Sequence, residues 1–194
     1  KRQVYKNTKV DAQMLKDADV DAVILAIGSS PITIKLEGMD KLQHASAPEV
    51  LRHEVCPKGK VAVIGGGLVG LETADTLATD GCDVTVLEMK DEIGSDLGSL
   101  RKIAVMMKLQ QMQVKMLPNS KVCKFTEEGI VLEDETLVPC NCAVFAVGFA
   151  SNDSHLLVEE CEKRQIPCRV IGDAKSARRA LDAIAEGFEA ARTL

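Results

Sequence analysis

Three glycines near the middle of the 194-residue chain have the spacing of a phosphate-binding turn. They form the pattern Gly-x-Gly-x-x-Gly at positions 65–70, directly after the apolar run 61–64. In such a pattern the first glycine permits a tight turn, the second admits a pyrophosphate, and the third lets a helix pack closely. The helix N-terminus then offers free N–H groups and a partial positive charge to phosphates. The residues assigned to a dinucleotide are Gly65, Gly66, Gly67, Leu68, Val69 and Gly70.

The residues that follow the glycines predict a helix and a second strand. Apolar residues recur at helical spacing over 68–80, and Gly81 stands where a helix commonly ends. Residues 83–88 then have the pattern of a strand that ends in Glu88, where a dinucleotide fold places an acid to bind the adenosine ribose. This order of elements favours a dinucleotide site over an ordinary tight turn followed by a strand-end carboxylate.

The type of dinucleotide depends on the residues around Glu88. A carboxylate at this position repels a 2′-phosphate, and NADP sites commonly supply an arginine nearby. The next arginine after Glu88 is Arg101, so the sequence favours NADH over NADPH. Lys90 leaves NADPH open as the alternative.

Composition limits the possible classes of protein. The chain is 46% apolar and 27% charged, which suits one sizeable domain or two small ones. Its net charge is −5 without a basic block, so we expect no nucleic-acid partner. No apolar run is long enough to span a membrane and no secretory signal is found, so a cytoplasmic location without membrane contact is expected.

The cysteines and histidines predict no metal site. Seven scattered cysteines are typical of reduced thiols rather than a disulfide framework. Cys140 and Cys142 are interpreted as buried thiols, because no fourfold cysteine cluster accompanies them. His44, His53 and His155 share no metal-ligand spacing.

Upstream of the glycine motif the sequence predicts short elements. We expect a strand over 3–7, a helix over 11–16 and a buried strand over 21–27 that ends at Gly28. A polar connection then leads to a capping box at 46–49, which opens a helix that runs to about residue 53.

Downstream the pattern remains that of an α/β protein. We expect a helix over 96–113, a small antiparallel meander over 120–138 and a buried strand over 141–147. A last strand and turn over 168–174 precede a helix over 176–192. The predicted fold class is α/β, a Rossmann-like NAD(P)-binding domain with a parallel sheet and an antiparallel β-meander.

Four segments together resemble the two-dinucleotide-binding flavoprotein reductases, in which an NAD(P)H domain is inserted into an FAD domain. These segments are 25–31, 61–74, 145–148 and 171–174. The helix over 178–191 is similar to the closing helix of the NADH:flavin oxidoreductases that include 2,4-dienoyl-CoA reductase, 2-enoate reductase and trimethylamine dehydrogenase. These are multidomain relatives of Old Yellow Enzyme, and the resemblance covers nearly the whole chain.

The resemblance implies a division into domains. Residues 1–55 would be a remnant of the FAD-binding domain, 56–150 the NAD(P)H-binding domain and 151–194 the C-terminal part of the FAD-binding domain. The family's FAD glycine fingerprint, flavin barrel and iron–sulfur cysteines are not found in this sequence. We therefore expect a fragment of a longer parent, in which any FMN or iron–sulfur cluster is held outside this chain.

The resemblance also implies roles for further residues. Gly148 would lie at the nicotinamide half of NADH, and Gly28 would lie beside the FAD. Gly172 and Asp173 match a Gly-Asp turn whose aspartate binds the ribityl chain of FAD. The structural alternatives are that Gly28 and Gly148 terminate strands and that Asp173 is a helix N-cap.

The implied function is hydride transfer from NADH to FAD, with electrons passing on to other redox centres. Because the cofactors do this chemistry, no catalytic side chain is predicted. The fragment alone is expected to be inactive, to bind FAD weakly or not at all, and to self-associate as a possible homo-oligomer. Its other partner would be the missing N-terminal portion of the parent. The alternative is a non-catalytic dinucleotide-binding module with a regulatory or structural role.

Overall fold

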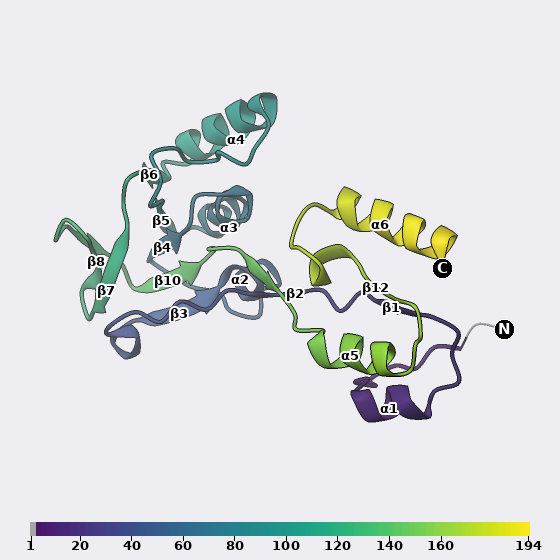
Figure 1. The fold of residues 1–194 in the computed structure, drawn as a ribbon. Helices are drawn as coiled ribbons and strands as arrows, with labels where there is room; N and C mark the ends of the chain where they lie inside the picture. The colour runs from purple at the N-terminus through teal and green to yellow at the C-terminus, as the bar shows by residue number, and fades with distance from the viewer. Residues whose placement is uncertain (1–2) are drawn as a thin grey trace. The chain divides into compact units, whose positions relative to one another are not determined.

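The computed structural model describes residues 3–194, and the chain divides into two compact units (Figure 1). Unit 1 consists of the described part of Lys1–Ser30 together with Phe149–Leu194. Unit 2 is Pro31–Gly148.

Unit 2 is built on a five-stranded sheet whose neighbouring strands are all parallel. The central strands are short, mainly apolar runs whose residues are almost all buried, as expected for strands covered on both faces. In sheet order the strands are β3 (Gln43–Ser46), β10 (Cys142–Phe145), β4 (Lys60–Ile64), β5 (Asp83–Leu87) and β6 (Lys115–Leu117).

Helices cover one face of this sheet and an antiparallel meander covers the other. Because side chains alternate along a strand, Val61 and Val63 of β4 pack with the helices, whereas Ala62 and Ile64 pack with the meander. The helices are α2 (Ala47–Leu51), α3 (Leu68–Thr79) and α4 (Ser99–Gln111). The meander consists of β7 (Val122–Thr126), β8 (Gly129–Leu132) and β9 (Leu137–Pro139), and the short η1 (Met39–Lys41) precedes β3.

Unit 1 contains a parallel pair of strands, β1 (Val23–Leu25) and β12 (Cys168–Val170). Its helices α1 (Ala12–Asp17) and α5 (His155–Lys163) contact each other. The guanidinium of Arg164 joins them by donating hydrogen bonds to the carbonyls of Leu15 and Ala18. The turn η2 (Gly172–Ala174) and the helix α6 (Ala180–Thr193) follow β12. A separate ladder pairs β2 (Ser29–Pro31) with β11 (Phe149–Ser151).

The predicted α/β fold class is confirmed, and so are most elements of unit 2. α3 ends where the sequence indicated, because Gly81 takes a left-handed φ of +86° and Cys82 N–H donates to Leu77 O at 3.0 Å. The capping box of α2 is present, with Glu49 accepting from the Ser46 backbone N–H.

Several predicted bounds are wrong. Residues 3–7 form no strand, and β1 is shorter than the strand expected over 21–27. The last helix starts at Ala180 instead of residue 176, because the chain after Gly172 first forms a 3-10 turn. The elements that were not predicted include α5, β6 and, in what the sequence indicated was a polar connection, β3.

The first boundary between the units lies at 30/31, whereas the sequence placed a domain boundary at 55/56. The physical reason is β3, which pairs with β10 along its full length and so joins the sheet of unit 2. The assignment of the two units to FAD and NADH stays a prediction.

Candidate functional site

Two glycines of the 65–70 motif are required by close packing. Gly65 follows β4 with a φ of +109°, and a Cβ there would lie 2.4 Å from the carbonyl oxygen of Ala146. A Cβ at Gly70, in the first turn of α3, would lie 1.9 Å from the carbonyl oxygen of Gly65. Strand, turn and helix therefore come together only with glycine at these two positions.

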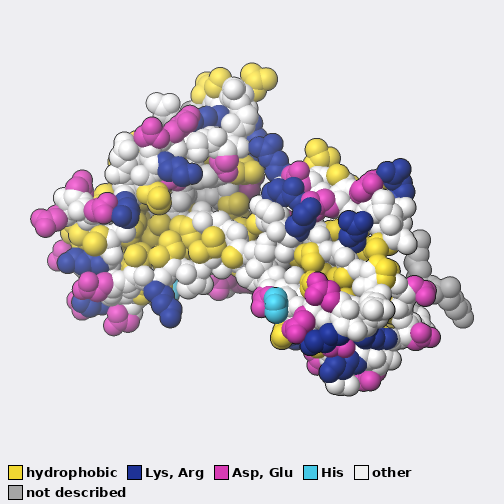
Figure 2. Space-filling model, viewed as in Figure 1, with side chains coloured by type: hydrophobic (Ala, Val, Ile, Leu, Met, Phe, Trp, Pro, Cys, Tyr) yellow, Lys and Arg dark blue, Asp and Glu magenta, His cyan; other side chains and the backbone are white. Residues whose placement is uncertain are grey.

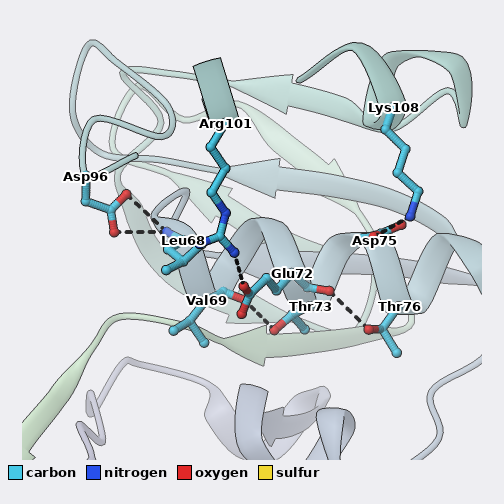
Figure 3. Close-up of polar contacts among 9 residues, drawn as sticks. All are labelled: Leu68, Val69, Glu72, Thr73, Asp75, Thr76, Asp96, Arg101 and Lys108. Atoms are coloured by element: carbon cyan, nitrogen blue, oxygen red, sulfur yellow. Dashed lines mark hydrogen bonds and ion pairs between the residues drawn. The ribbon is translucent and has the colours of Figure 1, made fainter. Parts of the chain in front are cut away.

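The second glycine of the motif, Gly67, stands directly before the N-terminus of α3. Gly67 is the N-cap of α3, and the helix begins with Leu68. The backbone N–H of Leu68 is bonded to both carboxylate oxygens of Asp96, at 3.1 and 3.0 Å (Figure 3). This end of α3 thus already holds an anion, as the partial positive charge of a helix N-terminus favours.

Glu88 lies beside the glycine turn. Its side chain is buried, and its two oxygens accept hydrogen bonds from the backbone N–H groups of Gly66, at 2.7 Å, and Lys90, at 2.9 Å. A carboxylate oxygen can accept more than one hydrogen bond. Glu88 is therefore held in place by the backbone and keeps acceptor capacity for a hydroxyl group.

A cavity of about 480 Å³ opens next to these residues, which is within the size range of small-molecule sites. Its walls are mostly apolar, with a few charged and polar groups, and Figure 2 shows a patch of apolar side chains on the face of unit 2 in view. The motif residues in the lining are Gly65, Gly67, Leu68, Val69, Glu88 and Gly148. The other lining residues are Ile34, Leu36, Ile64, Leu87, Met89, Lys90, Asp96, Ser120, Lys121, Val122, Ala146 and Val147.

The cavity lies at the carboxyl ends of the central strands. From β4 the chain continues to β5 and β6 on one side, whereas β10 returns on the other side. In open α/β sheets, ligands bind at this kind of reversal in strand order. Gly148 comes just after β10 with a φ of +105°, and its carbonyl accepts from Ile32 N–H at 3.0 Å.

The three residues assigned to FAD lie in unit 1, where the paired strands β1 and β12 lead to Gly28 and Gly172. Ser29 Oγ, next to Gly28, donates to Asp173 Oδ2 at 3.1 Å. Asp173 also accepts from Arg178 N–H at 3.3 Å, and it lies inside η2 instead of capping α6, whose N-cap is Arg179.

A carboxylate from α6 fixes the Gly172 turn. Glu186 accepts from Gly172 N–H at 2.7 Å and pairs with the side chains of Arg178 and Lys175. The hydrogen bond from Arg178, followed by that from Gly172, lowers the pKa of Glu186 to about 2. The turn that carries Asp173 is thus held by a charged network within unit 1.

Residues 1–174 match the family model described as pyridine nucleotide-disulphide oxidoreductase. The chain belongs to this family. It is 36% identical over 191 residues to the bilirubin reductase of Mediterraneibacter gnavus, aligning 95% of this chain with 29% of that protein. It is 34% identical over 200 residues to the cinnamate reductase of Clostridium sporogenes, aligning 99% of this chain with 29% of that protein.

A solved structure of 2-naphthoyl-CoA reductase has the same fold. It superposes with a TM-score of 0.86 at 24% sequence identity, covering 97% of this chain and 29% of that one. The chain therefore spans less than a third of the length of these three relatives. The family consists of oxidoreductases with a Rossmann-type fold that binds NAD(P)H and FAD.

Some residues that line the cavity were not predicted from the sequence. Ser120, Lys121 and Val122 reach the cavity because the unpredicted strand β6 ends at the same sheet edge as β4 and β5. The hydrogen bond from Ser120 N–H to Glu88 O, at 2.7 Å, fixes this connection. The strand pattern of 115–117, three residues long, was too short to be recognised.

Cys140 and Cys142 are buried in different core clusters, on the meander side and on the helix side of the sheet. Burial raises the pKa of each thiol to about 11. Across residues 3–194, no group of three or more His, Cys, Asp or Glu side chains is placed to hold a metal ion. No helix in that range is long and apolar enough to cross a membrane.

Proposed function

We propose that unit 2 binds NADH and that the chain works within a longer flavin-dependent reductase of the 2-enoate reductase type. The observation that supports this most directly is the glycine turn at 65–70 with Glu88 fixed beside it, at the edge of a cavity of about 480 Å³. The residues present fit a dinucleotide. The N-terminus of α3 suits a phosphate, Glu88 suits the ribose hydroxyls, and the apolar walls of the cavity suit a ring. Unit 1 would contribute Gly28, Gly172 and Asp173 to the binding of FAD.

Each part of the site has a separate role in this proposal. The N-terminus of α3 would bind the pyrophosphate, and Glu88 would accept hydrogen bonds from the hydroxyls of the adenosine ribose. Gly148 would leave room for the nicotinamide half, since the atom nearest to a Cβ added at this glycine is Ile32 Cδ1, at 3.7 Å. The apolar walls, such as Leu36 and Val122, would exclude water from the bound cofactor.

The chemistry supplied by the bound cofactors is the transfer of a hydride from the nicotinamide to the flavin. The residues of this chain would bind and orient, and none needs to act as acid, base or nucleophile. The names of the two relatives, bilirubin reductase and cinnamate reductase, support an organic molecule as final electron acceptor. Residues for that acceptor, and any FMN or iron–sulfur cluster, would belong to other parts of the parent protein.

The preference for NADH is tested by calorimetric titration of the chain with NADH and NADPH. We expect the wild type to bind NADH more tightly, and Glu88→Ala to weaken NADH binding about tenfold or more, because a hydrogen bond to a charged acceptor is lost. Glu88→Gln serves as a second variant, since it keeps the size of the side chain. Asp91→Ala, which removes an exposed carboxylate of the same loop that does not line the cavity, is the control. Tighter binding of NADPH by the wild type would contradict the assignment.

A further inference from the structure

The loop between β5 and α4 places a carboxylate on the N-terminus of α3. Both oxygens of Asp96 accept from Leu68 N–H (Figure 3). The first backbone hydrogen bond of the helix runs from Leu71 N–H to Gly67 O, at 2.9 Å. Leu68 N–H is thus one of the donors that an α-helix leaves unused at its start, and Asp96 uses it.

The Asp96 carboxylate also lies close to Gly67, the second glycine of the motif. A Cβ at Gly67 would lie 3.1 Å from Asp96 Oδ2. Gly67 is the glycine whose missing side chain lets a pyrophosphate approach the backbone. Asp96 also lines the cavity that contains Glu88 and Gly148. A carboxylate therefore lies where the proposed function requires a phosphate.

We propose that Asp96 competes with the pyrophosphate of the dinucleotide for the N-terminus of α3 and thereby sets the affinity of the site. This inference rests on the proposed binding of NADH by unit 2. The Leu68 N–H cannot serve the carboxylate and a phosphate fully at once, and two anions in contact repel each other. NADH binding then includes the displacement of Asp96, which weakens the observed affinity.

The loop that carries Asp96 has two anchors besides the hydrogen bond to Leu68 N–H. Asp96 is exposed, and Gly98, two residues on, has open space around it. The loop is anchored independently of Asp96 by the hydrogen bond from Gly94 N–H to Gly66 O, at 2.7 Å. It is also held by the ion pair between Lys102 and Glu92, at 2.5 Å. Both anchors can therefore stay in place when the Asp96 carboxylate leaves Leu68 N–H.

The test compares the affinities of NADH and adenosine for the full chain and its variants. Asp96→Asn keeps the shape of the side chain and removes its charge, and Asp96→Ala removes the side chain beyond Cβ. The matched control is Asp91→Asn, an exposed carboxylate of the same loop that does not line the cavity. Thermal melts followed by circular dichroism establish that each variant is folded. We expect both Asp96 variants to bind NADH about tenfold more tightly, with adenosine affinity and the control unchanged.

Three results would overturn the inference. If the wild type binds NADH and the folded Asp96 variants bind it equally or more weakly, Asp96 does not compete. An equal gain for NADH and adenosine would show that Asp96 does not act on the pyrophosphate, which adenosine lacks. If neither the wild type nor the variants bind NADH, the proposed function fails and this inference fails with it.

Discussion

At the scale of single residues, the site depends on two positions that leave no room for a Cβ, Gly65 and Gly70, and on the fixed carboxylate of Glu88. At the strand-to-helix turn, a Cβ on Gly70 would collide with the Gly65 carbonyl, and a Cβ on Gly65 would collide with the Ala146 carbonyl. Glu88 is held by the backbone N–H groups of Gly66, which follows β4, and Lys90, which follows β5. Both the glycine pattern and the position of Glu88 follow from the close approach of strand, turn and helix.

A substitution at the third glycine tests this packing. Gly70→Ala should lower the free energy of unfolding by about 3 kcal/mol, because the added Cβ overlaps the Gly65 carbonyl and the helix must shift. Gly98→Ala is the control, since a Cβ there meets nothing within 4 Å, and its cost should stay below about 1 kcal/mol. Urea unfolding measures both, and equal stability of the two variants would contradict the packing argument.

At the scale of elements, α4 is attached to α3 by ion pairs on the surface and by an apolar side chain below. Arg101 pairs with Glu72 at 2.8 Å and Lys108 pairs with Asp75 at 2.6 Å, as Figure 3 shows. Leu109 is completely buried against the core on the helix side of the sheet. Exposed ion pairs contribute little, so the apolar contact should dominate.

The prediction for α4 follows from that comparison. Leu109→Ala should cost about 3 kcal/mol of unfolding free energy, because it leaves a cavity in the core. Arg101→Ala and Lys108→Ala should each cost less than about 1 kcal/mol. Chemical denaturation measures the unfolding free energy of the three variants. A larger loss of stability from Arg101→Ala or Lys108→Ala than from Leu109→Ala would show that surface ion pairs hold the helix.

The charged network around Glu186 predicts a pH dependence of unit 1. Because the pKa of Glu186 is about 2 in the folded chain and about 4.5 without these partners, its stabilising effect is complete above about pH 4.5. That effect is lost as the pH falls toward about 2. Between these values the melting temperature of the wild type should fall more steeply than that of Glu186→Gln. Parallel curves for the two proteins would contradict the role of this carboxylate.

The sequence predicted elements well where several signals coincided. For α3, the glycine motif, the helical spacing and Gly81 all indicate the same bounds. β3 was missed because its residues Gln43–Ser46 are largely polar and its pairing with β10 is a contact across the sheet. The position of Asp96 could not be predicted either, because it caps a helix that begins 28 residues earlier in the chain. Local patterns reveal motifs, whereas such contacts depend on the folded arrangement.

At the scale of the whole molecule, unit 1 leaves an apolar face of α6 exposed. Leu181, Ile184 and Phe188 follow helical spacing and are 75%, 69% and 71% exposed. Apolar patches of this kind favour association. We therefore expect the chain to self-associate as its concentration rises, and the double variant Leu181→Ser, Phe188→Ser to reduce this.

Sedimentation velocity over a range of concentrations tests the association. Leu156→Ser is the control, since Leu156 is equally exposed but lies on α5. The double variant should sediment more slowly than the wild type at high concentration, while the control should match the wild type. A wild type that stays monomeric throughout would show that α6 does not mediate association under these conditions.

The central claim is that NADH binds at the carboxyl edge of the sheet in unit 2. Titration of the ¹⁵N-labelled chain with NADH, followed by amide chemical shifts, tests it most directly. We predict the largest shift changes at residues 65–70, at Glu88, at 120–122 and at 146–148, the segments around the cavity. Shift changes confined to other segments, or no change at saturating NADH, would contradict the claim.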